Sequence, residues 1–192
     1  MKIHVISSSL SDESRSRKVA HIYHRRLRNR SIQSELIDLK EVNPPNFDNS
    51  SIFQTEVYKN LHMKLDEADG LVFASPVYNW GCCAELKKLI EYIGSTPMDG
   101  SLKGALFDKV ITFVNAAGLP HSYMAYTTLA SSLMLDFKCI INPYNVYIHN
   151  RHWNEEESLI DEAQKRIEKS VKVMIELTTL LKPRTYSSTW EI

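Results

Sequence analysis

The sequence predicts an α/β protein in which helices cover both faces of a parallel β-sheet. Short β-branched or apolar runs alternate with longer amphipathic stretches along the chain. This alternation is typical of strand–helix–strand units, whose right-handed crossovers build a doubly wound parallel sheet. The length of 192 residues fits one domain, so we expect residues 1–192 to form a single unit.

Five segments have the composition of strands. The most apolar is Gly70–Ala74, and such an uninterrupted run is typical of a central parallel strand that is buried on both faces. The predicted strands are Lys2–Ser7, Gln33–Leu39, Gly70–Ala74, Lys109–Val114 and one within Lys138–Ile148.

Helices are predicted between and after these strands from apolar residues spaced three and four apart. We expect Asn154 to cap the last helix, Glu155–Glu157 to favour its positive end, and Pro183 to stop it. The Pro44-Pro45 pair predicts a loop over Glu41–Ser50. The other predicted helices are Arg15–Asn29, Phe53–Asp66, Cys83–Gly94 and Tyr123–Leu135.

The composition excludes several classes of protein. Twenty-three Lys and Arg balance 23 Asp and Glu, which argues against a dedicated nucleic-acid binder. The chain lacks the roughly 18 consecutive apolar residues of a membrane span, and its first apolar run is too short for a signal peptide. Three cysteines cannot build a disulfide framework, so we expect a reducing, cytoplasmic location.

The charge balance is uneven along the chain. Residues 1–30 carry eight Lys and Arg but only two acidic side chains, and most of the basic residues belong to one predicted helix. A solvated basic helix face is the simpler interpretation. The alternative is that this surplus attracts a phosphorylated ligand or an acidic partner.

In a doubly wound sheet, ligands bind beyond the carboxyl ends of the strands, so we expect chemistry in the loops after the first, third and fourth strands. The first of these loops, Ser7–Arg17, holds six hydroxyls and leads into a helix, which predicts an anion site suited to a terminal phosphate. It contains no glycine, so it is neither a dinucleotide-binding Gly-x-Gly-x-x-Gly loop nor a Walker loop.

The other two loops predict a surface for a flat ligand. In Ala74–Lys87, Pro76 fixes the backbone, Asn79 offers an amide, and Tyr78 and Trp80 offer flat faces. A planar heterocycle suits these groups, and a structural turn with aromatic plugs is the competing interpretation. In Asn115–Ser122, small side chains let the backbone approach a flat ligand closely.

Together the three loops resemble the NADPH-dependent FMN reductase family, which includes quinone, azo and chromate reductases. Ser9 and Ser14 fall on the two serines of that family's Gly-Ser-x-Arg-x-x-Ser-x-Asn motif. The second motif, Ser-Pro-x-Tyr-Asn followed by Leu-Lys, is matched by Ser75, Pro76, Tyr78, Asn79, Leu86 and Lys87.

The sequence departs from the family pattern at several positions. Ser8 replaces a glycine, Ser16 an asparagine, and Cys83-Ala84 a Pro-Gly pair. Ser11 stands where the family has the arginine that binds phosphate. Our hypothesis is that Arg15 or Arg17 takes over the role of that arginine.

The resemblance implies a flavodoxin-like, five-stranded parallel sheet of order 2-1-3-4-5 that binds FMN. NADPH or NADH would be the co-substrate, and quinones, azo compounds, metal ions or free flavin the acceptors. A homodimer or homotetramer is implied as well. Because flavin N5 receives the hydride, no catalytic side chain is expected. The residues expected to bind the cofactor are Ser9, Ser11, Ser14, Arg15, Ser16, Pro76, Val77, Tyr78, Asn79, Trp80, Ala116, Ala117 and Gly118.

Other functions have weaker support in the sequence. A non-catalytic flavodoxin-type electron carrier is the alternative to an enzyme, but such carriers are strongly acidic and this chain is neutral. The adjacent Cys82 and Cys83 lack the Cys-x-x-Cys spacing of a redox motif. We expect no metal site at His149 and His152, and His121 is a weaker candidate for contact with nicotinamide or substrate.

Overall fold

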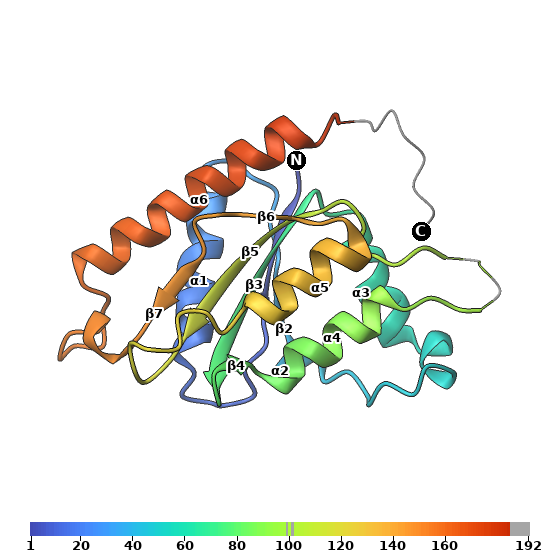
Figure 1. Cartoon of the computed structure of the whole chain (residues 1–192), viewed down its shortest axis with the longest axis horizontal. Coiled ribbons are helices and arrows are strands. Elements are labelled where there is room, and N and C mark those ends of the chain that lie inside the picture. Colours follow the sequence, from blue (N-terminus) through green and yellow to red (C-terminus); the bar gives the residue numbers. More distant parts are fainter. Residues whose placement is uncertain (99, 101, 185–192) are drawn as a thin grey trace.

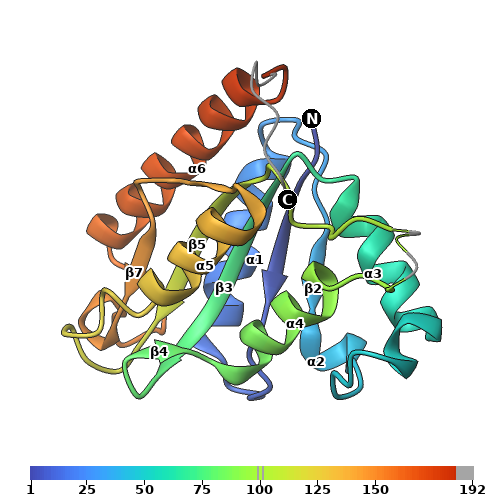
Figure 2. The ribbon, with the colours of Figure 1, turned by 45° about the vertical axis from the view of Figure 1, so that its right-hand side comes forward.

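A mostly parallel sheet forms the middle layer of the structure, and helices cover both of its faces (Figures 1 and 2). The computed structural model describes residues 1–98, 100 and 102–184. Four strands of the sheet pair parallel with one another, in the order β2 (Leu36–Asp38), β1 (Ile3–Ser7), β3 (Gly70–Tyr78) and β5 (Val110–Ala116), with β2 at the edge. The tail from residue 185, which the expected single unit includes, lies outside the described residues.

The predicted strand order is confirmed, with two additions. The order is β2-β1-β3-β5-β6, and the last predicted strand is divided into β6 (Ile140–Ile141) and β7 (Val146–Ile148), which both pair with β5. A two-residue strand, β4 (Gly81–Cys82), folds back antiparallel onto β3. The sequence did not predict this hairpin.

Two asparagine side chains explain why the last strand is interrupted. Pro143 has no N–H with which to continue the ladder, and the side-chain oxygen of Asn145, in place of a backbone carbonyl, accepts a hydrogen bond from the Phe113 amide at 2.7 Å. The buried Asn142 side chain donates to Thr112 Oγ1 at 2.9 Å, which fixes the start of the interruption against β5. Backbone pairing resumes at Val146, beside Val114.

The central strand β3 divides the core into two apolar clusters. Leu71 and Phe73 face the cluster under α3 (Glu56–Asp66), α4 (Ala84–Gly94) and α5 (Thr127–Phe137). Val72 and Ala74 face the cluster under α1 (Arg15–Arg28) and α6 (Asp161–Leu181). Side chains alternate between the faces of a strand, so the apolar run predicted for β3 serves both layers.

The start of α6 corrects one expectation. Asn154 does not cap this helix: its Oδ1 accepts from the Ser158 amide at 2.8 Å, which closes a separate turn, and Glu155–Glu157 lie in that turn. The helix begins at Asp161, so Asp161 and Glu162 are the acidic residues in its first turn. It ends at Leu181, before Pro183, as predicted.

Smaller boundary errors have local causes. Asp38 caps a short helix, α2 (Leu39–Val42), by accepting from the Lys40 amide at 3.0 Å, so the predicted strand ends before Leu39 and the predicted loop begins later. Thr55 caps α3 and separates it from a 3₁₀ turn, η1 (Ser51–Gln54). The remaining predicted helices are confirmed with shifted ends, the largest shift being at the start of α5.

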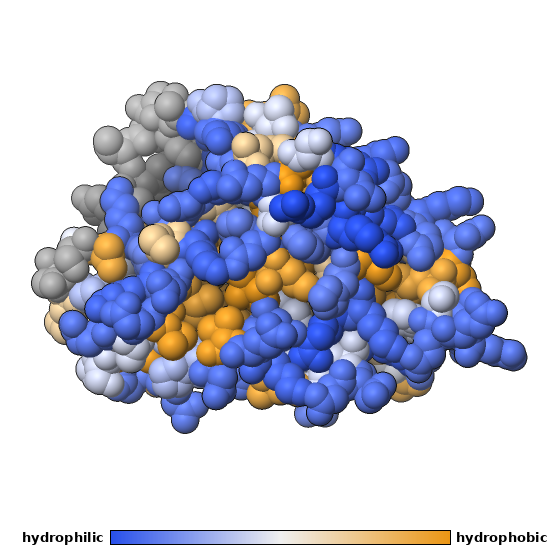
Figure 3. Space-filling view, turned by 180° about the vertical axis from the view of Figure 1, so that it is seen from behind, coloured by the Kyte–Doolittle hydropathy of each residue, from blue (hydrophilic) through white to orange (hydrophobic). Residues whose placement is uncertain are grey.

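Much of the basic surplus of residues 1–30 is paired within the chain. Arg26 lies 3.6 Å from Glu168 of α6, Arg30 bonds to the same carboxylate, and Lys18 bonds to Glu157. Seen from behind, the face that carries α1 is largely hydrophilic, with hydrophobic residues visible between the hydrophilic ones (Figure 3). These pairs favour the interpretation of a solvated helix face. No helix in the described part of the chain has the length and apolar run that crossing a bilayer requires.

Candidate functional site

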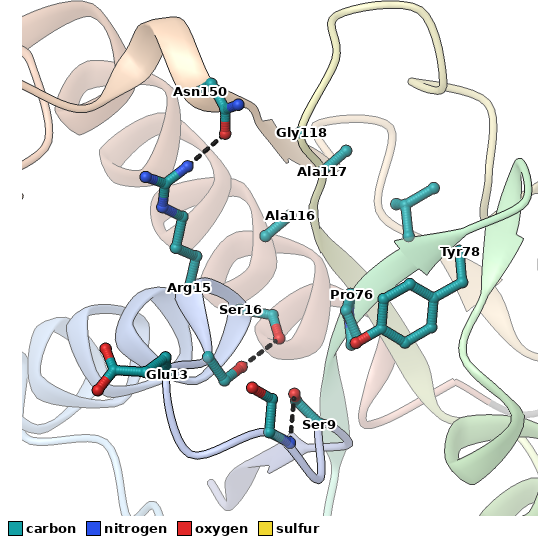
Figure 4. A pocket seen from close by; sticks show the side chains of 13 residues that line it. Ser9, Glu13, Arg15, Ser16, Pro76, Tyr78, Ala116, Ala117, Gly118 and Asn150 are labelled. Carbon is teal, nitrogen blue, oxygen red and sulfur yellow. Dashed lines mark hydrogen bonds between the residues drawn. The ribbon is translucent and has the colours of Figure 1, made fainter.

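The loops that follow β1, β3 and β5 meet at one edge of the sheet and enclose a cleft of about 250 Å³ (Figure 4). All the predicted cofactor residues except Asn79 and Trp80 line this cleft, and Glu13 and Asn150 line it as well. The lining residues are Ser9, Ser11, Glu13, Ser14, Arg15, Ser16, Pro76, Val77, Tyr78, Ala116, Ala117, Gly118 and Asn150.

The serine loop forms one wall of the cleft together with the first turn of α1. Ser14 is the N-cap: its Oγ accepts from the Arg17 amide at 3.1 Å and lies 3.0 Å from Ser16 Oγ. The amides of Arg15 and Ser16 precede the first acceptor within the helix. This wall therefore offers backbone N–H groups, hydroxyls and the positive end of a helix, a combination that binds anions.

Arg17 fixes the shape of this loop. Its guanidinium forms a 2.5 Å ion pair with Asp38 and donates to the carbonyl oxygens of Ser9 at 2.6 Å and Ser11 at 2.5 Å. The charge of the Arg17 guanidinium is thus paired within the protein, where it holds the loop backbone. Arg17 is not among the residues that line the cleft.

Arg15 lies at the cleft itself. It donates to Asn150 Oδ1, and its guanidinium carbon is 5.6 Å from the centre of the Trp153 ring. Figure 4 shows the side chain extending from the start of α1 along one side of the cleft toward Asn150. Of the two arginines that we considered as phosphate ligands, Arg15 is the one whose side chain lines the cavity.

Sequence reasoning missed Glu13 and Asn150. Asn150 follows β7, which pairs with β5, so the carboxyl-edge rule applied to the last strand would have found it. Glu13 lies inside the serine loop, and its carboxylate points away from Tyr78 in Figure 4. A carboxylate beside an anion site weakens the positive potential there.

The β3–β4 hairpin forms the opposite wall. Pro76 ends the buried part of β3, Val77 is half-buried, and Tyr78 lines the cleft while 57% of it is exposed. Asn79 and Trp80, which form the tip, have φ values of 49° and 65°. A left-handed conformation costs roughly 1–2 kcal/mol for a residue with a Cβ, which makes Trp80 an unusual occupant of this turn.

The loop after β5 closes the back of the cleft with small residues. The Ala117 amide donates to the Ile148 carbonyl at 2.9 Å, which ties this loop to β7. A Cβ atom placed on Gly118 would have Asn150 Nδ2 as its nearest neighbour, at 3.8 Å. The backbone here is thus fixed, and little side-chain volume separates it from the cavity.

The two adjacent cysteines connect the walls. Cys83 Sγ lies 3.1 Å from Ser8 Oγ and 3.4 Å from Ser75 Oγ, and so joins the ends of β1 and β3 to the start of α4. Cys82 Sγ accepts from Asn115 Nδ2 at 3.4 Å, and burial raises the pKa of the Cys82 thiol. Both thiols are free, and their contacts indicate a structural role.

The histidines lie beside the cleft. The rings of His149 and His152 are 3.9 Å apart, and the His149 amide donates to His152 Nδ1 at 3.1 Å. Among the described residues, no three or more His, Cys, Asp or Glu side chains are grouped to hold a metal ion. His121 is exposed and is not among the cleft-lining residues.

This arrangement can bind a ligand that has an anionic end and a flat body. The hydroxyls of Ser9, Ser14 and Ser16 bond to backbone amides or to each other. In the described structure none of these three hydroxyls bonds to a basic side chain that could activate it as a nucleophile. The chemistry is therefore expected to come from a bound cofactor.

A comparison with protein families decides the identity. The model of the family described as NADPH-dependent FMN reductase matches residues 1–152. The chain belongs to this family. It is therefore an oxidoreductase of a family that uses FMN and NADPH, as the serine loop and the Ser-Pro-x-Tyr-Asn segment predicted.

Individual relatives agree with this assignment. A protein of Geobacillus thermodenitrificans (strain NG80-2) described as an NAD(P)H-dependent FAD/FMN reductase is 25% identical over 139 residues, which are 71% of this chain and 70% of the relative. The flavoenzyme NAD(P)H:(acceptor) oxidoreductase FerB from Paracoccus denitrificans has a similar structure, with a TM-score of 0.75 at 16% identity, covering 94% of this chain and 98% of FerB.

A second solved structure has the same fold. An NADH:FMN oxidoreductase, EMOB, in its apo form matches with a TM-score of 0.72 at 16% identity, over 95% of this chain and 91% of EMOB. Together with the strand order, these likenesses confirm the predicted flavodoxin-like fold.

We expect acid to destabilise the protein between pH 7.5 and 5.5. Burial lowers the pKa values of His4, His149 and His152 below 6.5, and the Nδ1 atoms of His4 and His152 accept backbone hydrogen bonds that protonation would break. Below about pH 6.5 the unfolded chain therefore binds more protons than the folded chain. The neutral histidines contribute their full stabilisation above pH 6.5, and this contribution decreases as the pH falls through their folded-state pKa values. The loss is at most about 1.4 kcal/mol per pH unit for each group.

Urea denaturation at both pH values measures this effect. In a His4→Asn, His152→Asn variant, the asparagine oxygens keep acceptors near the Nδ1 positions without titrating, so the pH dependence should be weaker. An equal loss of stability in both proteins would contradict the assignment to these histidines.

Proposed function

We propose that the cleft binds FMN and that the protein uses NAD(P)H to reduce small acceptors. The observation that carries this proposal is the pairing of an anion-binding wall, at the start of α1, with a wall of small residues after β5, in one cleft. FMN has a phosphate at one end and a flat ring system at the other, so these walls suit both ends of it.

The phosphate would lie at the first turn of α1. Ser9, Ser11, Ser14 and Ser16 supply hydroxyls, and the helix start supplies amides and a positive potential. Arg15 supplies the formal charge in place of the family arginine that Ser11 replaces. Asn150 and the Trp153 ring hold the Arg15 guanidinium at the cleft wall before any ligand arrives.

The ring system would lie between the hairpin and the loop after β5. Pro76, Val77 and Tyr78 border it on one side, and the backbone of Ala116, Ala117 and Gly118 approaches it on the other. Asn79 and Trp80 stand at the hairpin tip, outside the lining, and we assign them to contact with the outer edge of the ring or with a second substrate.

When bound, FMN would supply the redox chemistry, as hydride acceptor for NAD(P)H and electron donor for the second substrate. The residues of the chain bind and orient the reactants. The contacts of Arg17, Cys83 and Ala117 hold the three loops in place, so that the cleft would keep its shape while the donor and then the acceptor bind.

We propose quinones, azo compounds, metal ions or free flavin as acceptors. The cleft is open to solvent at the exposed Tyr78, which leaves room for acceptors of different shapes. FerB, whose described activity leaves the acceptor unspecified, supports this breadth. The free thiols of Cys82, Cys83 and Cys139 support a reducing, cytoplasmic location.

We also propose a homodimer or homotetramer. Five large apolar side chains on α5 and the loop before it are at least half exposed, which is typical of a surface that another subunit covers. They are Leu119, Tyr123, Met124, Met134 and Leu135. Light scattering should give two or four times the 22.1 kDa mass of the chain, and the double variant Tyr123→Ser, Leu135→Ser should shift the mass toward one chain. A monomeric wild type would contradict the proposal.

Anaerobic reduction tests the main proposal. The protein reconstituted with FMN should lose its yellow absorbance rapidly when NADPH or NADH is added, and recover it when a quinone follows. A bound flavin whose colour is stable for an hour would instead indicate an electron carrier. A protein that remains colourless with added FMN would contradict the cofactor site.

Two charge variants test the phosphate end. Arg15→Ala should weaken FMN binding about tenfold or more, because a hydrogen bond to a charged group contributes about 1.5–3 kcal/mol. Glu13→Gln should strengthen binding by up to about fivefold, since it removes roughly 1 kcal/mol of repulsion. The Kd values follow from fluorescence quenching of FMN.

Matched controls locate the effect. Lys18→Ala removes a charge from the same helix at a residue that pairs with Glu157 and should leave the Kd unchanged. Arg17→Ala releases the loop backbone and should weaken FMN binding without reducing its salt dependence, whereas Arg15→Ala should reduce that dependence. Unchanged affinity in both arginine variants would refute their role.

A further inference from the structure

The tip of the β3–β4 hairpin holds a bulky residue in a conformation suited to glycine. Tyr78 pairs with Gly81, so Asn79 and Trp80 form a two-residue turn, and both have positive φ. Turns of this kind favour asparagine followed by glycine, because a Cβ at a left-handed position meets the backbone. Asparagine fits its position here, and tryptophan does not.

Packing within the chain does not compensate for this strain. Trp80 is 67% exposed, so most of the indole lies in solvent. An aromatic side chain stabilises a protein mainly by burying its surface, and this one buries little. Strained residues gather at binding sites, where a ligand uses the side chain that the strain presents.

The hairpin places Trp80 two residues from Tyr78, a residue that lines the cleft. Cys82, two residues after Trp80, bonds to Asn115 of β5 and lies 3.7 Å from the Ala125 carbonyl oxygen. Tyr78, two residues before it, lines the cleft, and its ring lies in front of Pro76 in Figure 4. The backbone of Trp80 is thus held on both sides, and most of its side chain is exposed.

We propose that Trp80 is the specificity-determining residue for the electron acceptor. Its indole forms a wall on which an acceptor with a planar aromatic ring stacks, and so favours planar acceptors over compact inorganic ones. This inference rests on the proposed reductase function. It assigns to Trp80 a contact with the acceptor, while Arg15 and the serine loop hold the cofactor.

Variants at this position give two readouts of opposite sign. Trp80→Gly should lower the ratio of kcat/KM for menadione to kcat/KM for ferricyanide about tenfold, which corresponds to about 1.4 kcal/mol. The same variant should raise the Tm of the protein by about 2–4 °C, because glycine relieves the strained turn. Two further variants are controls. Trp80→Phe should keep most of the wild-type ratio of the two kcat/KM values.

Tyr144→Ala, which removes an exposed aromatic residue outside the cleft lining, should not alter this ratio.

Several results would overturn the proposal. An unchanged ratio in Trp80→Gly excludes a role in acceptor choice, and a lower Tm shows that Trp80 supports the fold. Loss of oligomer mass in light scattering would assign Trp80 to a subunit contact instead. Failure of the reductase function is seen separately, as wild-type flavin that NAD(P)H does not reduce. In that case the Kd of menadione for wild type and Trp80→Gly, from equilibrium dialysis, decides the role of Trp80.

Discussion

Three neighbouring strands, β1, β3 and β5, run in one direction and end at the same edge of the sheet, and the cleft depends on this alignment. It brings segments that are some 70 and 40 residues apart in sequence into contact, so that a serine loop, a hairpin and a loop of small residues face one space. The apolar pairing of β3 with both neighbours fixes that alignment. Arg17 and Cys83 hold the loops that extend beyond this edge of the sheet.

The two arginines near the start of α1 illustrate how neighbouring residues of one type take different roles. They are two positions apart on a helix, about 200° around its axis, and so face different surroundings. Arg17 meets Asp38 and the loop carbonyls, and its charge is used within the protein. Arg15 meets a neutral amide and an aromatic ring, which orient its charge without neutralising it. A cation kept in that state remains able to pair with an incoming anion.

Most of the fold and the cleft could be predicted because they depend on local patterns. The uninterrupted apolar run of β3, the proline and serine loops and the edge rule for parallel sheets led to the parallel sheet and to the three loops of the cleft, and the family resemblance added the strand order and the set of cofactor residues. The cap of α6 could not be predicted, because Asn154 is a suitable N-cap that a turn with Ser158 uses instead. Asn150 was missed because the edge rule was not extended to the last strand, β7, and Glu13 because its place in the cleft depends on how the serine loop folds in three dimensions. The β4 hairpin was missed because Trp80 argues against a tight turn.

The two outer edges of the sheet have a consequence for how the protein behaves in a concentrated solution. On one side the last strand, β2, has three residues, and on the other the chain is divided into β6 and β7 with Pro143 between them. A strand from another molecule that approached either edge would find too few consecutive backbone groups to bond with. Short and interrupted borders of this kind protect a sheet rich in β-branched residues from growing into fibrils, while its interior remains continuously paired.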